Sequence, residues 1–228
     1  MQGLLKFSDG LAAIVIRIGK LAAWLAVLLI VVILYDVITR SIKSSSWIAD
    51  VPWLLDFFNT VDPYISSTKL QELEWHIHGV LLLLCFGYAY VKDAHVRIEL
   101  LRDRFSMKLR AWVEIVGIVV GLFFYCYVVI AYGTEFAIRS FERGEGSSAM
   151  TGLSDRWIIK SFLPIGFTVL AMAGLSVMIK CLVYLFGPPH LQDEAGDYFR
   201  PKGLLEDEAE TLDEAVIDVT SGAAGQSR

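Results

Sequence analysis

Four long apolar segments dominate this sequence and constrain what it can fold into. Their hydrophobic residues run continuously, so they lack the single apolar stripe of a helix that covers a soluble core. A bilayer core about 30 Å thick requires roughly 20 mostly apolar residues in one helix. The sequence therefore predicts an all-α integral membrane protein with four transmembrane helices, at about residues 21–40, 74–91, 111–132 and 159–186.

The overall composition supports a membrane protein. Hydrophobic residues make up 55% of the chain and the mean hydropathy is +0.55, which is more apolar than a typical soluble domain. A soluble protein with four buried helices is the alternative, and the absence of amphipathic stripes counts against it. The three cysteines, Cys85, Cys126 and Cys181, all fall within predicted spans, so we expect them to pack as small apolar residues and not to form disulfides.

Basic residues predict the orientation. The segment between the second and third spans, residues 92–110, holds the densest group of Lys and Arg, which favours the cytoplasmic side of the membrane. With four spans, both termini share that side, although Arg40 and Lys43 act against this orientation. We expect a membrane domain at residues 1–187 and a disordered acidic cytoplasmic tail at 188–228. Nothing in the sequence favours nucleic acid as a partner.

The first predicted outer loop contains an amphipathic segment, "WIADVPWLLDFFNTVDPYI", that begins at Trp47. Its apolar residues recur at helical spacing, but it is too short and too charged to span a membrane. We expect a short helix that lies in the outer interface, anchored by Trp47 and Trp53. A helix docked on a partner protein would use the same residues, so both interpretations stay open.

A cluster of alternating acids and histidines precedes the second span: Glu72, Glu74, His76 and His78. On a helix the two i,i+4 pairs point about 160° apart, so they cannot converge on one ion. We expect no metal and no cofactor, and a haem site would need facing histidines that the other three spans lack. The cluster is interpreted as a polar helix end, as a contact with another subunit, or as a metal or proton site.

The middles of the predicted spans are essentially uncharged. Asp36 can pair with Arg40 one turn later, Glu114 can pair with Arg110, and Lys180 can extend to the membrane surface. A carrier usually shows ionisable residues or broken helices at mid-membrane. The pattern therefore favours a scaffold over a solute carrier.

Residues 8–186 resemble the small membrane subunit of TRAP transporters, the tripartite ATP-independent periplasmic family. The matching features are "QELEWHIHGVLLLLCFGYAYVKDAHVRIELL", the N-terminal "YDVITR" rhythm and the four-span layout. The resemblance implies a non-enzymatic scaffolding subunit of an ion-driven importer of a small solute, often an organic acid. It also implies a location in the bacterial inner membrane and two partners besides the lipid bilayer, namely a large permease subunit and a periplasmic solute-binding protein.

The alternative function is a membrane-anchor subunit of a respiratory or redox enzyme, and a small stand-alone exporter is a third possibility.

Two groups of residues are candidates for a role in the TRAP assembly. Gly117 and Gly121 form a small-x-x-x-small face that serves packing within this chain or docking on the large subunit. The partner-contact candidates are Trp47, Trp53, Glu72, Glu74, Gly117 and Gly121, and the candidates for orienting the basic loop are His95, Arg97 and Glu99.

Overall fold

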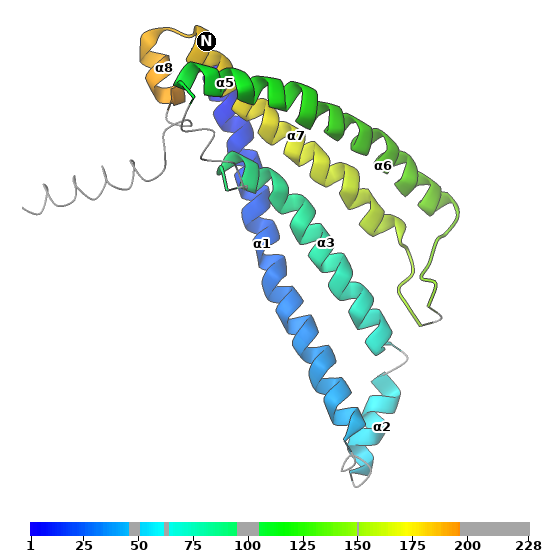
Figure 1. The fold of residues 1–228 in the computed structure, drawn as a ribbon. Helices are drawn as coiled ribbons and strands as arrows, with labels where there is room; N and C mark the ends of the chain where they lie inside the picture. Colours follow the sequence, from blue (N-terminus) through cyan, green and yellow to red (C-terminus); the bar gives the residue numbers. More distant parts are fainter. Residues whose placement is uncertain (46–50, 62–63, 95–104, 150, 197–228) are drawn as a thin grey trace, which may run out of the picture.

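The structure, a computed structural model, describes residues 1–45, 51–61, 64–94, 105–149 and 151–196. Helices account for all regular secondary structure in these residues (Figure 1), so the predicted all-helical fold is confirmed. In chain order they are α1 (Gln2–Ser44), α2 (Pro52–Val61), α3 (Ser67–Val91), α5 (Met107–Val116), the π-helix η2 (Gly117–Phe123), α6 (Phe124–Glu142), α7 (Trp157–Phe186) and α8 (Pro189–Gly196).

Local sequence signals set several helix ends. Ser66 Oγ accepts a hydrogen bond from the backbone N–H of Lys69 at 3.3 Å, and Ser106 Oγ accepts one from Leu109 N–H at 3.4 Å. Each bond satisfies a backbone donor that the first helical turn leaves without a partner. α7 ends at Phe186; the next residue, Gly187, is extended and is followed by two prolines, which cannot continue the helix.

Among the described residues, three helices are long and apolar enough to cross a membrane. They are α1, the continuous helix Met107–Glu142 formed by α5, η2 and α6, and α7. The predicted second span is also helical and forms the 25 residues of α3. α3 is not one of these three helices, because charged and polar residues from Glu72 to His78 lower the hydropathy of its first half. α1 is 43 residues long and extends well beyond the predicted span at 21–40.

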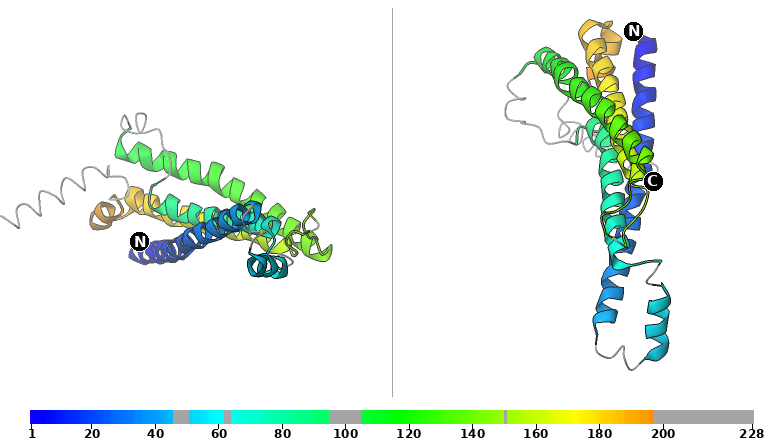
Figure 2. Two further views of the ribbon diagram at one scale, coloured as in Figure 1. Left: turned by 90° about the horizontal axis from the view of Figure 1, so that it is seen from below. Right: turned by 90° about the vertical axis from the view of Figure 1, so that its right-hand side faces the viewer.

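α7 is the central helix of the fold. It packs against α1, α3, α5, η2, α6 and α8. In the most apolar 18-residue stretch of α7, 44% of the residues are buried, against 11% in the corresponding stretch of each of the other two candidate spans. Figures 1 and 2 show α1 and α3 together on one side of α7 and α6 along the other side. The side of α6 that points away from α7 is therefore exposed.

Glycines allow the long helices to approach one another closely. A methyl group added at Gly19 of α1 would overlap the side chain of Tyr88 on α3. One added at Gly166 of α7 would lie 2.7 Å from Cβ of Leu83 and 2.9 Å from its carbonyl oxygen. Helices in membranes associate through this kind of close packing, because lipid and side chains are equally apolar.

Polar contacts join α1 to α7 near the N-terminus. The hydroxyl of Ser8 donates to the carbonyl oxygen of Ser176 at 2.9 Å, and the Ser176 hydroxyl donates to the carbonyl oxygen of Ser8 at 2.9 Å. One turn along, Lys180 Nζ lies 3.1 Å from Asp9 Oδ1. The lysine predicted to extend to the membrane surface thus forms an ion pair with α1.

The sequence predicts a disordered tail from residue 188 onward, and for its first residues this prediction is wrong. Pro189–Gly196 form α8, because the buried side chains of Leu191 and Ala195 pack against Leu5, Ile179 and Val183. The apolar contact with α1 and α7 outweighs the polar composition of the segment. Residues 197–228 lie outside the described residues.

Candidate functional site

Glu72 is the centre of a polar cluster at the start of α3. Its Oε1 atom accepts hydrogen bonds from Ser147 Oγ and from Nη2 of Arg156, the latter at 3.3 Å. Its Oε2 atom accepts a hydrogen bond from the backbone N–H of Leu153 at 2.7 Å. All three donors belong to the connection between α6 and α7, so one carboxylate fastens that connection to α3.

The connection between α6 and α7 is also held by contacts within itself. The backbone N–H of Ser147 donates to the carbonyl oxygen of Leu153 at 2.9 Å, and Arg156 N–H donates to Glu145 O at 3.0 Å. The Glu145 carboxylate forms an ion pair with Lys160 on the first turns of α7. The segment is therefore a folded unit and not a loose linker.

A second carboxylate joins α1 to the start of α3. Asp36 is buried, its Oδ1 atom accepts a hydrogen bond from Ser67 Oγ at 2.7 Å, and its Oδ2 atom pairs with Arg40 as the sequence predicts. The two carboxylates thus link three segments that are distant in sequence. We call this set the polar rim, and it comprises Asp36, Arg40, Ser67, Glu72, Ser147, Leu153 and Arg156.

Hydrogen bonds keep the acidic groups of this region charged. The bond from Ser147, followed by the one from Leu153 N–H, lowers the pKa of Glu72 below its ordinary value of 4.5 because both stabilise the carboxylate. The bond from Lys160, the largest contribution, lowers the pKa of Glu145. Both groups therefore accept hydrogen bonds as carboxylates at neutral pH.

The remaining members of the Glu/His cluster point elsewhere. Nδ1 of His76 contacts the carbonyl oxygen of Glu72, and His78 is exposed. Glu74 lies on the face of α3 that also carries the buried Leu70 and Ile77, and its Oε1 atom is buried without a hydrogen-bond partner in the described part of the chain. No group of three or more His, Cys, Asp or Glu that could hold a metal ion occurs among the described residues.

The other predicted candidates lie apart from the polar rim. Trp53 on α2 is 72% exposed, whereas Trp47, His95, Arg97 and Glu99 lie outside the described residues. Gly117 and Gly121 fall in η2, and a methyl group added at either position would meet no atom of the described residues within 4 Å. The described part of the chain therefore brings no helix close to these two glycines, and both predicted roles, packing within the chain and docking on the large subunit, stay predictions.

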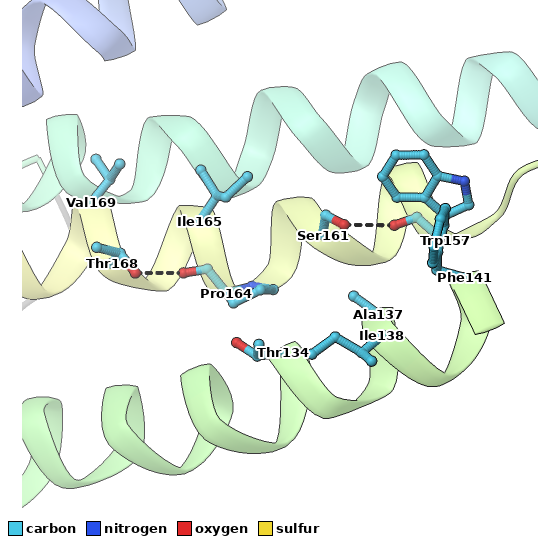
Figure 3. A pocket seen from close by; sticks show the side chains of 10 residues that line it. All are labelled: Thr134, Ala137, Ile138, Phe141, Trp157, Ser161, Pro164, Ile165, Thr168 and Val169. Carbon is cyan, nitrogen blue, oxygen red and sulfur yellow. Dashed lines mark hydrogen bonds between the residues drawn. The ribbon is translucent and has the colours of Figure 1, made fainter.

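An apolar groove of about 710 Å³ runs between α6 and α7 (Figure 3). Its lining holds no charged residue, and its three hydroxyl groups donate to carbonyl oxygens one turn earlier in their own helices, at 2.6 Å for Thr134, 2.8 Å for Ser161 and 2.7 Å for Thr168. Phe141 and Trp157 meet edge to face at one end. The groove offers an apolar surface and no cation that would hold an organic acid.

Sequence reasoning missed the partners of Glu72. Ser147, Leu153 and Arg156 stand in a segment rich in Gly, Ser and charged residues that is typical of an ordinary loop. No spacing in the sequence connects them with α3, and Leu153 contributes only its backbone. The π-helix was also missed, and the two glycines at Gly117 and Gly121 are its only local signal.

Comparison with known proteins gives a family. A model of the DctQ component of tripartite ATP-independent periplasmic transporters matches residues 63–183, which is more than half of the chain. This stretch contains α3, the whole of the helix Met107–Glu142, the connection held by Glu72 and most of α7. No curated protein and no solved structure matches the chain. The chain therefore belongs to the DctQ family and is a small permease component of a TRAP transporter.

Proposed function

We propose that this chain is the accessory, scaffolding small subunit of a TRAP transporter that imports a small solute, an organic acid by family resemblance, with the energy of an ion gradient. The solute and ion sites lie in a large permease subunit, and a periplasmic solute-binding protein delivers the solute. The chain itself catalyses no reaction. The family match supports this assignment, since the family is a transporter component.

One observation carries the scaffolding role, namely the polar rim. Its two carboxylates, Asp36 and Glu72, both accept hydrogen bonds from groups of the same chain. They hold the end of α1, the start of α3 and the α6–α7 connection in fixed relative positions. A carrier that alternates between two states needs such segments to move, whereas a brace needs them fixed.

The proposal includes a membrane arrangement with four spans. α3 is the second span, and its polar first turns lie at the outer surface together with the polar rim. Both termini and residues 92–110 lie in the cytoplasm of a bacterial cell, and the protein is in the inner membrane. Residues 1–187 form the membrane domain, and α8 begins the cytoplasmic tail at 188–228.

α2 is placed in the outer interface. Its Phe58 is buried and lies under Lys43, whose Nζ is 5.3 Å from the ring centroid, so this face is tied to α1. Trp53 and Phe57, four residues apart, are both exposed. Aromatic side chains at such positions favour the headgroup layer, close to the point where α1 leaves the membrane.

Reconstitution tests the scaffolding role directly. Proteoliposomes that contain the large permease subunit and receive the solute-binding protein are compared with and without this chain. We expect uptake only when all three proteins are present, and no uptake by this chain with the binding protein alone. Full uptake without this chain, or solute transport by this chain alone, contradicts the proposal. A Soret band in the visible spectrum of the purified chain would instead support a redox anchor.

A further inference from the structure

A second groove lies between α6 and α7, on a different face of α6 from the apolar groove drawn in Figure 3. Its volume is about 460 Å³, within the range of protein sites that hold small molecules. Val128 and Val129 on α6 and Leu163 on α7 form an apolar part. Glu135 and Arg139 form a polar part, so the lining combines a hydrocarbon surface with one charge of each sign.

The position of this groove along its helix sets its depth in the membrane. The uncharged stretch Ile115–Thr134 is about as long as the roughly 20 residues that cross a hydrocarbon core. Glu135 and Arg139 follow this stretch directly, so they lie in the headgroup layer. Val128 stands two helical turns before Glu135, so the apolar part of the groove reaches about 10 Å into one leaflet.

The two charged groups of the lining are open to a ligand. Glu135 and Arg139 form an ion pair one helical turn apart, and their side chains are 52% and 60% exposed. One carboxylate oxygen and one guanidinium nitrogen make this contact, which leaves the second oxygen and further N–H groups for other bonds. An exposed pair of this kind contributes little to stability. It does present an acceptor and a donor side by side at the end of an apolar groove.

The surroundings of the groove carry no net charge. Residues 135–160 hold as many acidic as basic side chains. Lys160 is only 14% exposed, pairs with Glu145 and lies 3.9 Å from the centroid of the Phe136 ring, which lines the groove. Its charge is therefore balanced locally, and its ammonium holds an aromatic wall in place. An anionic headgroup gains no attraction from such a neutral region, whereas a headgroup with both signs matches the Glu135–Arg139 pair.

We propose that this groove binds one phospholipid whose headgroup joins a phosphate to a primary ammonium, the chemistry of phosphatidylethanolamine. The phosphate accepts hydrogen bonds from Arg139, the ammonium donates to Glu135, and one acyl chain lies along Val128, Val129 and Leu163. A primary ammonium has three N–H donors for a carboxylate, whereas the quaternary group of phosphatidylcholine has none. The inference goes beyond the scaffolding role and requires only that the helix Met107–Glu142 spans the membrane.

Lipid retention tests the site on the full chain and on its complex with the large permease subunit. Each sample is equilibrated in detergent with equal amounts of phosphatidylethanolamine, phosphatidylcholine and phosphatidylglycerol that share the same acyl chains, and bound lipid is counted by native mass spectrometry. We expect one phosphatidylethanolamine per chain in both samples, enriched several-fold over the other two lipids. Equal retention of the three lipids, or a preference for phosphatidylglycerol, overturns the inference. Retention by the chain but not by the complex also overturns it, because a partner helix then fills the groove.

Substitutions test the two contacts of the headgroup. Arg139→Gln is expected to lower bound phosphatidylethanolamine by roughly three- to tenfold, the range for one charge-assisted hydrogen bond at a partly exposed group. Glu135→Gln should lower phosphatidylethanolamine and raise phosphatidylglycerol, because Arg139 then has no acid beside it. Arg143→Gln is the matched control, since Arg143 is exposed, lies one turn further on and does not line the groove. Equal retention by Arg139→Gln and Arg143→Gln overturns the headgroup assignment.

Filling the groove tests the acyl-chain contact. Val129→Trp should lower retention of all three lipids several-fold, whereas Ala131→Trp, at nearly the same depth but outside the lining, should not. Equal retention by these two variants overturns the acyl-chain contact. Glycerophosphoethanolamine, which has the headgroup and no acyl chains, should not displace the lipid, and displacement at equal concentration would instead identify a site for a soluble ligand. If a thermal melt shows that Val129→Trp is unfolded, the surface change Arg139→Gln decides the question. Failure of the complex to form counts against the proposed function, and the full-chain measurement still tests the lipid site.

Discussion

The Oε2 atom of Glu72 accepts a hydrogen bond from the backbone N–H of Leu153 at 2.7 Å, across 81 residues of sequence. The bond joins the start of α3 to the segment that leads into α7. Because the donor is a backbone group, a change of side chain at position 153 leaves it in place, whereas any change that removes the carboxylate breaks it. The contribution of this contact is therefore best measured at Glu72.

Replacing Glu72 by alanine is expected to release the α6–α7 connection. Hydrogen bonds to a charged group contribute about 1.5–3 kcal/mol, so we expect a loss of stability of this order and a lower melting temperature in detergent. Hydrogen exchange at Ser147 and Leu153 should accelerate while the interior of α7 stays protected. Glu135→Ala is the matched control, since Glu135 is exposed and its one ion pair among the described residues is with Arg139, one turn away. Equal effects of the two substitutions would contradict a special role for Glu72.

The stability of the isolated chain should depend on pH in the acidic range. The folded-state pKa of Glu72 is lowered, so its stabilising contribution is fully present above the unfolded value of about 4.5 and is lost as pH falls through the folded value. Glu145 acts in the same direction. Melting curves between pH 7 and pH 3 should show this loss, and Glu72→Gln should reduce its size. A Glu72→Gln curve parallel to that of the unmodified chain would count against the assignment.

The contact between α1 and α3 should depend on Gly19. Gly19→Ala introduces a methyl group that overlaps Tyr88, and overpacking of this kind is expected to destabilise the fold by about 1–3 kcal/mol. Gly10→Ala is the control in the same helix, because a methyl group there meets no atom of the described residues within 4 Å. It should leave stability unchanged or raise it by up to about 1 kcal/mol through helix propensity. Thermal unfolding in detergent measures both, and equal stability of the two variants would contradict the packing described.

Cysteine labelling of intact cells tests the proposed topology. Lys108 and Ser148 are both exposed; Lys108 lies at the start of the helix Met107–Glu142, and Ser148 lies in the connection that follows its end. Lys108 is chosen over the neighbouring Ser106 because the Ser106 side chain caps α5 and a cysteine there would remove that hydrogen bond. A membrane-impermeant thiol reagent should label Lys108→Cys only after the cells are opened and Ser148→Cys without opening. The reverse pattern would invert the topology, and labelling of both positions from outside would contradict four spans.

The position of α2 can be measured by fluorescence. We expect lipids brominated on their acyl chains to quench Trp53, and we expect the quenched signal to decrease in Trp53→Phe. The exposed fraction of the Trp53 side chain, 72%, leaves its ring free to enter the headgroup layer. If only an aqueous quencher reduces the fluorescence of Trp53 in the complete complex, Trp53 faces water, and both placements of α2, in the lipid interface and on a partner, are wrong. Protection from both quenchers on addition of the large subunit would favour docking on that partner.

Much of the architecture could be predicted from local sequence. The apolar runs predict helices of membrane-spanning length because insertion depends on the composition of about 20 consecutive residues. The pair of Asp36 and Arg40 could be predicted from their spacing of one helical turn, and it is present. α8 could not be predicted, because Leu191 is an isolated apolar residue whose burial depends on Leu5, at the opposite end of the chain.

The sequence by itself determined that this chain is helical, that it has segments suited to lipid, and that it resembles the small subunit of a TRAP transporter, because these properties reside in short runs of residues. Only the tertiary structure decided what Glu72 does. Judged only from the spacing of its neighbours along the helix, this carboxylate is compatible with a metal site, a partner contact or a polar helix end. Its actual donors, Ser147, Leu153 and Arg156, reach it because α7 packs on α3, and that packing depends on the close approach of Gly166 to Leu83.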